Sequence, residues 1–447
     1  VTPLSIDVDT LAASTRAGGL FLLESTDAVV GANVTVTVSE VTADSSAALV
    51  PQVALGGLST SVDGTIILVS TAGSLEVATG ASVDAATSGL VRIEAATDLT
   101  VNADVQSGTG HISLIATNGI SFGASLSVAT GGTGDVYIDA GSGALTQVAT
   151  TTTSAGANVR LAAVGDVTLG SVSGVGISVL SGGNILAAAG SVNNLSATSL
   201  RLNAASGIGA GSRHLTTTVA QVSALAQNGS IFMTESDDVT VTAVTVITNQ
   251  VSATATTSAQ TDLAQADLRS GGNGDIVLVS LAGSIILNDG NSDHAVVVAD
   301  GSGSVLVGAA VDLSVNSGVA SGSGDIALAA GNNLNLAGIS VTTTSGDISL
   351  SAATGAVTMP ATATLTTTTG NLRVSAQGNA TVGQLSADAV SLVSEGGSLV
   401  AAEFSTINVT ADSLRISASG AIGAADRHLL TDVATLSADA TSNGIFI

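Results

Sequence analysis

The residues in this sequence that are best suited to chemistry are aspartates next to glycine-rich turns. GGTGDVYID from Gly131 and GGNGDIVLV from Gly271 are similar to the nonapeptide of calcium-binding β-rolls, in which glycines free backbone carbonyl groups and an aspartate supplies a carboxylate. Asp135 and Asp275 come one residue early for that motif, and its copies are not consecutive. We therefore expect corner turns here, with no cofactor. These aspartates remain weak calcium candidates, as does a separate pair, Asp237 and Asp238.

Enzymatic chemistry has little support in the composition. Enzymes that cleave polysaccharides need paired carboxylates or a strong base, together with aromatic rings on which sugars stack. The chain has one tyrosine, Tyr137, and neither tryptophan nor lysine. We predict no catalytic residues and no enzyme, and keep a lyase-type or tailspike-type enzyme as an alternative. Ice binding is a further alternative, since threonines could form flat outward ladders; the runs are Thr150 to Thr153, Thr216 to Thr218, Thr342 to Thr344 and Thr366 to Thr369.

The histidines mark a repeat rather than a catalytic centre. Arg213 and His214 are followed by leucine, and so are Arg427 and His428, in two closely similar segments. One histidine in each repeat cannot form a metal cage or a catalytic triad. We expect an exposed polar turn, with a contact at a junction between repeats as the functional alternative.

A short strand motif must position all of these residues. GDIVLVSLAGSIIL from Gly274 places a turn glycine before alternating aliphatic residues, and similar segments begin at Gly64, Gly110, Gly324 and Gly346. Alternation with a period of two places one set of side chains inside a strand layer. The inner aliphatics recur about every 18 to 25 residues, at Ile66, Val91, Ile112, Val136, Val159, Ile177 and Leu200. We predict an all-β parallel β-helix (β-solenoid), a rod of about 18 to 20 coils of roughly 20 to 25 residues each.

The same register predicts which side chains face outward. Five arginines each stand between two inward aliphatics, so their guanidinium groups should lie outside; they are Arg92, Arg160, Arg201, Arg373 and Arg415. Two stretches fit the pattern poorly, 37–63 and 248–273. We expect weakly patterned coils there, with projecting loops as the alternative.

A longer repeat lies over the coils. RLNAASGIGAGSRHL from Arg201 returns as RISASGAIGAADRHL from Arg415, and Leu4, Leu215 and Leu429 are equivalent positions. We predict a tail of a preceding repeat at 1–3, repeat units at 4–214 and 215–428, and the start of a third unit at 429–447. This arrangement is typical of one section of a longer tandem array.

Charge and composition argue against several classes of partner and site. The net charge is −25, and all nine basic residues are arginines, which argues against nucleic acid because phosphates need clustered cations. Cysteine is absent, so disulfides and thiolate metal sites are excluded. No apolar run reaches the ~18 residues of a membrane helix, so we expect no transmembrane segment.

With this motif, the long repeat and the SGIG…RHL marker, the chain resembles the filamentous haemagglutinin-like surface proteins of bacteria over essentially its whole length. The resemblance implies a right-handed parallel β-helix that is secreted to the bacterial cell surface and acts as an adhesin or fibre. We therefore expect a non-enzymatic extracellular structural rod. Its expected partners are further copies of itself, associating laterally or end to end into filaments or sheets, or the surface of a host or neighbouring cell.

Overall fold

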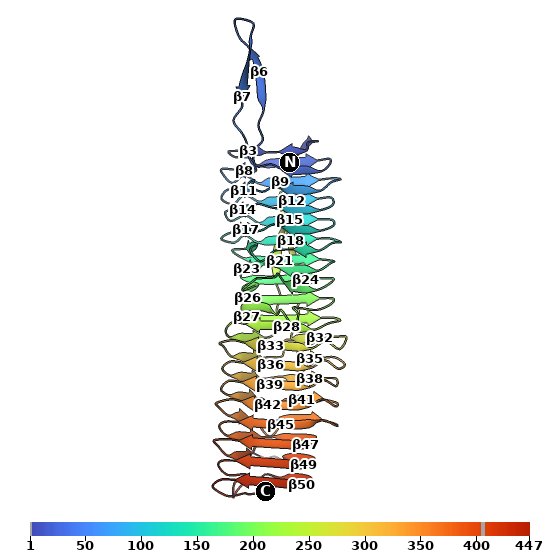
Figure 1. The fold of residues 1–447 in the computed structure, drawn as a ribbon, viewed down its shortest axis with the longest axis vertical. Helices are drawn as coiled ribbons and strands as arrows, with labels where there is room; N and C mark the ends of the chain where they lie inside the picture. The colour runs from blue at the N-terminus through green and yellow to red at the C-terminus, as the bar shows by residue number, and fades with distance from the viewer. Residues whose placement is uncertain (1, 404–406) are drawn as a thin grey trace. The chain divides into compact units, whose positions relative to one another are not determined.

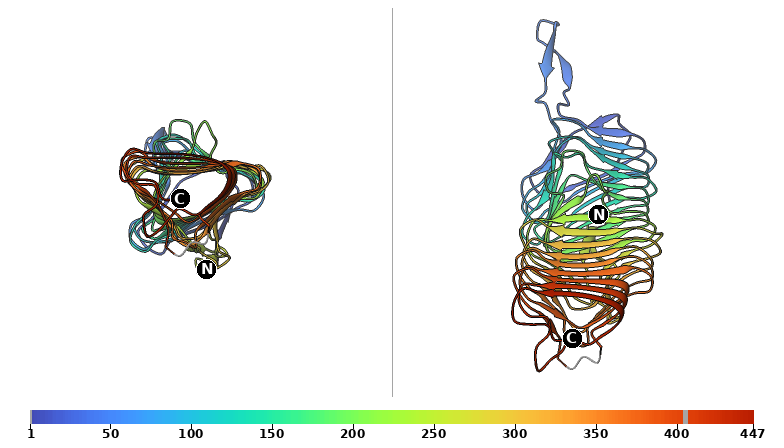
Figure 2. Two further views of the ribbon diagram at one scale, coloured as in Figure 1. Left: turned by 90° about the horizontal axis from the view of Figure 1, so that it is seen from below. Right: turned by 60° about the horizontal axis from the view of Figure 1, so that its bottom comes forward.

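The computed structural model describes residues 2–403 and 407–447, and these fold into stacked coils of short parallel strands. Figure 1 shows that within each unit the strands of successive coils lie one above another, and Figure 2 shows the coils end-on, with a three-sided outline. No helix occurs in the two described ranges. The predicted all-β parallel β-helix is confirmed. Its handedness stays a prediction.

Contacts divide the chain into two compact bodies. Unit 1 comprises Val1–Ala197 and Val246–Asp262, and unit 2 comprises Thr198–Thr245 and Leu263–Ile447. These units reflect compactness and not sequence equivalence, so the repeat boundaries at Leu215 and Leu429 stay predictions. Of the predicted leading segment 1–3, Val1 lies outside the described residues.

Unit 1 has three series of parallel strands, one for each side of the coil. The first is β1 Leu4–Ile6, β4 Leu20–Glu24, β9 Ile66–Ser70, β12 Val91–Ala95, β15 Ile112–Ala116, β18 Val136–Ala140, β21 Asn158–Ala163 and β24 Gly176–Ser181. The second is β2 Thr10–Leu11, β5 Ala28–Val30, β10 Leu75–Val77, β13 Leu99–Val101, β16 Ile120–Phe122, β19 Leu145–Thr146, β22 Val167–Leu169 and β25 Ile185–Ala187. The third is β3 Ala13–Thr15, β8 Leu58–Thr60, β11 Val83–Ala85, β14 Val105–Ser107, β17 Ser127–Thr130, β20 Thr152–Ser154, β23 Ser171–Ser173 and the start of β26 Leu195–Ala204.

Unit 2 repeats the plan, with some strands turning a corner without a break. Its first series is β28 Ile231–Glu235, β33 Ile276–Ser280, β36 Val305–Ala309, β39 Ile326–Ala330, β42 Ile348–Ala352, β45 Asn371–Ala376, β47 Gln384–Ser394, β49 Val409–Ala418 and β50 Thr431–Ala440. Its second is β29 Val239–Val241, β34 Ile285–Leu287, β37 Leu313–Val315, β40 Leu334–Leu336, β43 Val357–Thr358, β46 Ala380–Val382 and β48 Leu399–Ala401. The third is β27 Leu215–Ala226, β32 Leu268–Ser270, β35 Ala295–Ala299, β38 Gly318–Ser321, β41 Ser340–Thr343 and β44 Thr364–Thr367, and it continues into β47.

Aliphatic ladders form the core of each unit. In unit 2, Ile276 pairs with Val305, Val305 with Ile326, and Ile326 with Ile348, and all four side chains are buried. In unit 1 the same ladder runs through the predicted inner residues from Ile66 to Ile177. Each buried aliphatic side chain contributes ~1.5 to 3 kcal/mol before chain entropy opposes it. The predicted core register is confirmed.

Glycine is required at one corner because the backbones of successive coils meet there. A Cβ at these positions in unit 2 would lie only 2.0 to 2.3 Å from the carbonyl oxygen of the glycine one coil earlier; they are Gly274, Gly303, Gly324, Gly346 and Gly370. Inward hydroxyl groups close the corner. Thr343 Oγ1 donates to the Gly324 carbonyl and Thr367 Oγ1 donates to that of Gly346. In these two threonine runs the buried residue therefore serves the coil corner and is not part of an outward ladder.

Candidate functional site

The two poorly patterned stretches each contain an antiparallel hairpin, so the expectation of weakly patterned coils there was wrong. The first hairpin pairs β6 Thr37–Val41 with β7 Ala47–Pro51, and the second pairs β30 Ile247–Val251 with β31 Thr257–Thr261. They share one design. A single bridge closes each base, and a residue with positive φ, Ser45 or Ala255, shapes each tip.

The second hairpin lies against unit 1, of which it forms part, although it is encoded between two segments of unit 2. The Asp135 carboxylate is central to this contact. Its Oδ2 accepts hydrogen bonds from the backbone N–H of Asn249 at 2.9 Å and from that residue's side-chain amide at 2.8 Å. The Asn158 amide donates to the Ile247 carbonyl at 2.8 Å. Asp135, one of the calcium candidates, is thus buried as a hairpin anchor.

Arginine side chains extend under the hairpin. The Arg160 Nε lies 3.1 Å from Asp262 Oδ1, and the Ser178 hydroxyl donates to Asp262 Oδ2 at 2.7 Å. Arg92 donates through Nη1 to the Val251 carbonyl and also pairs with Glu94. A second set of fixed polar partners therefore holds the hairpin against the strand face.

The predicted register of the arginines is correct, but three of the five guanidinium groups are not outside. Arg92 is 8 % exposed and Arg201 is 4 % exposed, and the Arg160 side chain is largely covered. In unit 2, the Arg201 Nε donates to the Leu263 carbonyl at 3.0 Å. Strand alternation fixes the side on which a residue lies, but it does not reveal what covers that side.

Unit 2 carries the equivalent surface without a hairpin on it. A groove of about 600 Å³ runs along the outside of β42, β45, β47, β49 and β50. It is lined by the residues that correspond to Asp135, Asn158, Arg160, Ser178 and Arg201, namely Asp347, Asn371, Arg373, Ser391 and Arg415. Of this second set, all except Ser391 are exposed. In unit 1, Asp135, Asn158, Arg160 and Ser178 are therefore covered, whereas the equivalent set in unit 2 is largely open.

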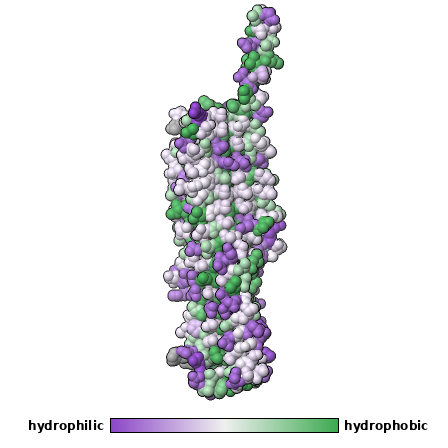
Figure 3. All heavy atoms as spheres, turned by 90° about the vertical axis from the view of Figure 1, so that its left-hand side faces the viewer, coloured by the Kyte–Doolittle hydropathy of each residue, from purple (hydrophilic) through white to green (hydrophobic). Residues whose placement is uncertain are grey.

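The first hairpin, like this groove, is exposed to solvent. Every residue of β6 and β7 is exposed, and Figure 1 shows the pair projecting beyond the coils of its unit. Figure 3 shows hydrophobic side chains on it among polar ones. Val41 is 76 % exposed, whereas Val251 at the equivalent position of the second hairpin is fully buried. An apolar hairpin surface in water is typical of an interaction segment.

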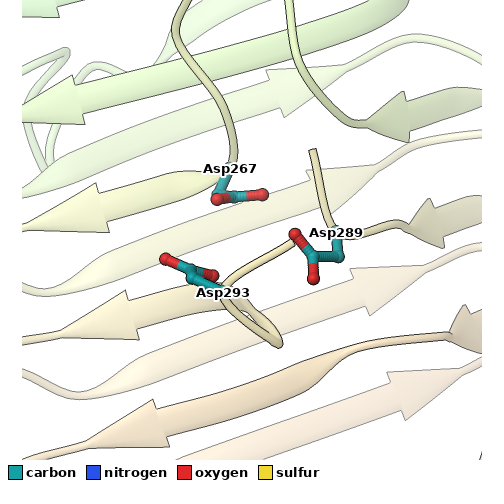
Figure 4. Close-up of side chains that lie close together, drawn as sticks. All are labelled: Asp267, Asp289 and Asp293. Carbon is teal, nitrogen blue, oxygen red and sulfur yellow. The ribbon is translucent and has the colours of Figure 1, made fainter. Parts of the chain in front are cut away.

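A carboxylate cluster lies on a different part of unit 2. Asp267, Asp289 and Asp293 bring one carboxylate oxygen each within 4.8 Å of the others, the one set of three such groups found among the described residues (Figure 4). Burial raises the pKa of Asp267, whereas backbone N–H groups, first that of Asn291, lower the pKa of Asp289. Oxygen ligands of this kind suit calcium. The Arg269 guanidinium, however, pairs with both Asp267 and Asp293 and supplies positive charge there.

None of the four calcium candidates from the sequence belongs to this cluster. Asp238 Oδ1 accepts the Ser284 N–H at 2.7 Å, and Asp275 Oδ1 accepts the Ser304 N–H at 2.8 Å, so both hold the corner of the following coil. Asp237 contributes its backbone carbonyl to the hydroxyl of Ser280. The observed cluster escaped sequence analysis because coil stacking, and not a local motif, brings Asp267 and Asp289 together.

The histidine markers occupy the same turn in both repeats. The His214 ring lies 5.6 Å from that of Phe232, and the His428 ring lies 6.1 Å from that of Phe446. Arg213 and Arg427 close equivalent bridges, to Ala210 and Ala424. His214 also hydrogen-bonds Thr234 at 2.8 Å. These four markers build a local turn, and a role in a junction between repeats stays a prediction.

Tyr137, the one aromatic ring considered for sugar stacking, is buried. Its hydroxyl donates to Asp139 Oδ2 at 2.8 Å, and the Arg160 guanidinium carbon lies 5.2 Å from the ring centroid. Burial is also the main cause that raises the Tyr137 pKa. This side chain therefore stabilises the arginine beneath the second hairpin and offers no open platform to a sugar.

Comparison with known proteins adds no relative. No family model, curated protein or solved structure matches this chain. The described part of the chain also contains no helix that is long and apolar enough to cross a membrane.

Proposed function

We propose that this chain is a non-enzymatic section of a repetitive surface fibre or adhesin, exported to the outside of a bacterial cell. One observation carries the proposal: the hairpin encoded with the second repeat is built into unit 1. Repeated along a longer chain, such an arrangement would join each repeat to the next, and it suits a protein whose length is set by the number of repeats.

The physics of the coil supports a structural role. Parallel stacking lets each coil satisfy the backbone hydrogen bonds of its neighbours, so a repeat can be added without redesigning the core. With ~4.8 Å of rise per coil and about nine coils, one repeat would add ~45 Å of length. Length can then increase while the surface chemistry stays the same.

Electron microscopy of the native material on the cells that produce it tests this proposal. We expect thin surface filaments that an antibody to this chain labels at regular intervals. Labelling confined to the cell interior, or to isolated compact particles, would contradict it. Cell-binding assays with the purified chain then separate an adhesin, which binds saturably, from a purely structural fibre.

An enzyme of the lyase or tailspike type remains the alternative function. The described residues show the polar groups of the unit 1 face engaged by the hairpin and Tyr137 buried, and neither observation favours carbohydrate chemistry. Incubation with acidic polysaccharides, followed by detection of new reducing or unsaturated ends, would identify such an activity.

A further inference from the structure

We propose that the unit 2 groove is the docking site for the β6–β7 hairpin of a second copy of this chain, joined in line so that Leu4 of that copy takes the place of Leu429. The inference deepens the proposed function, on which it rests, by stating how one repeat engages the next. Its basis is that unit 1 already shows a hairpin of the same construction in the equivalent groove.

The polar anchors of that groove are present and open. In unit 1, Asp135 accepts from the backbone N–H at position 249 and Asn158 donates to the carbonyl at position 247. In the proposed contact Asp347 would accept from Ser39, and Asn371 would donate to the carbonyl of Thr37. Because the hairpin backbone supplies these groups, their pairing does not depend on the hairpin side chains.

The base of the hairpin offers the next match. Arg201 donates to the carbonyl of Leu263, and Arg415 would donate in the same way to the carbonyl of Val53. At the neighbouring position, Gln52 replaces Asp262 and would face Arg373 with an amide oxygen in place of a carboxylate. This polar contact would carry less charge than its counterpart.

At the tip end of the hairpin, the groove residues differ between the two units. In unit 1, Val251 lies against Arg92 and Ser113, whose guanidinium and hydroxyl bond its backbone. The equivalent positions in unit 2 are Leu306 and Ala327, and Leu306 is itself partly exposed. Val41 would therefore meet an apolar surface. Since Ala327 offers no acceptor to its N–H, we expect this docking to be weaker than that within unit 1.

A second position on the first strand of each hairpin, Thr248 in β30 and Val38 in β6, also suits docking. Thr248 is buried in unit 1 with no hydrogen-bond partner for its hydroxyl in the structure. The equivalent residue of the first hairpin is Val38, which has the same shape without the hydroxyl and is 52 % exposed. Docking would bury this valine without stranding a polar atom.

A fused chain tests the proposal directly. Residue 428 of one copy is joined to residue 4 of a second copy, which preserves the equivalence of Leu4 and Leu429. The first-copy hairpin then serves as an internal control for the second-copy hairpin. We expect amide hydrogen exchange in β6–β7 to be about tenfold or more slower in the second copy than in the first. Equal exchange in both copies would overturn the docking.

Cysteine pairs locate the contact, because the chain has no cysteine of its own. Val41→Cys in the second copy and Ala327→Cys in the first should be joined by a short bismaleimide. Ser113→Cys with Val251→Cys in the unfused chain is the benchmark, since Val251 N lies 2.8 Å from Ser113 Oγ. If the benchmark pair is cross-linked and the pair in the fused chain is not, the proposed register is wrong.

Charge variants separate docking from folding. Arg415→Glu combined with Arg373→Glu in the first copy should abolish both the cross-link and the protection, whereas Arg16→Glu, also exposed, should leave them unchanged. If the fused chain does not fold, unfused Val41→Cys and Ala327→Cys chains are mixed. A cross-linked dimer then supports the inference, and its absence at the highest soluble concentration overturns it. If surface filaments are seen on cells but this cross-link does not form, the docking is wrong and the proposed fibre function is unaffected.

Discussion

The Arg160 guanidinium lies 3.1 Å from the carboxylate of Asp262, a residue 102 positions later in the chain. Both side chains are largely covered, and the Ser178 hydroxyl completes the contact. This pair holds the second hairpin in unit 1.

Removal of one member of this pair should be costly. Asp262→Ala removes the nearer of two carboxylates from the covered guanidinium and leaves only Asp139, whose Oδ2 lies 3.8 Å from Arg160 Nη1, so we expect unit 1 to lose about 2 to 3 kcal/mol of unfolding free energy. Gln52→Ala is the matched control, because Gln52 holds the same position on the open hairpin and should change stability by less than ~0.5 kcal/mol. Urea unfolding measures both variants, and equal effects would contradict the docked arrangement.

A methyl group at the glycine corner should not fit. The Cβ of Gly346→Ala would lie 2.1 Å from the Gly324 carbonyl oxygen, and the stacked backbone cannot move aside without displacing the next coil. We expect ~1 to 3 kcal/mol of destabilisation or more. In Gly211→Ala the new Cβ would meet only the Phe232 ring at 3.6 Å, so this control should be tolerated. Thermal unfolding of the two variants gives the comparison.

The pH dependence of stability should depend partly on Glu235. Burial is the main cause that raises the pKa of this carboxyl above its ordinary value of 4.5. The folded state therefore binds the proton more tightly than the unfolded state, and stability falls as pH rises from 4.5 through the raised pKa. Glu235→Gln should remove this slope, and Glu40→Gln on the exposed hairpin should keep it. Urea unfolding midpoints measured from pH 4 to 8 test this prediction. An unchanged slope in Glu235→Gln would show that Glu235 does not cause the pH dependence.

Arg269 should be needed mainly because of Asp267. The arginine lies 3.6 Å from Asp267 Oδ2, a buried atom without a hydrogen-bond partner in the structure. Arg269→Ala should cost ~1 to 3 kcal/mol at neutral pH by leaving that charge uncompensated. The double variant with Asp267→Asn should recover part of the loss, since the charge is then gone. A double-mutant cycle with no coupling energy would show that the two side chains act independently.

The sequence could predict the coil because its signals are local. Alternation around Ile276 and Ile326 and the glycine before each strand specify face, register and corner within a few residues. Docking of the second hairpin could not be predicted, because Arg92 and Val251 meet across 159 positions. A local signal for the hairpins themselves was present: small polar residues around Ser45 and Ala255 separate two strand-like runs. Nothing in the sequence pointed to the Asp267 cluster, which forms only when coils stack.

The late position of the second hairpin has a consequence for inheritance. Unit 1 is completed by Val246–Asp262, a segment that the gene encodes after Ala197. A crossover that exchanges whole repeats would therefore separate the strand face of unit 1 from the hairpin that covers it. Substitutions on one side, such as arginine to leucine at the position shared by Arg92 and Leu306, would then favour compensating changes on the other. Duplications that copy both parts together should consequently survive more often than those that divide them.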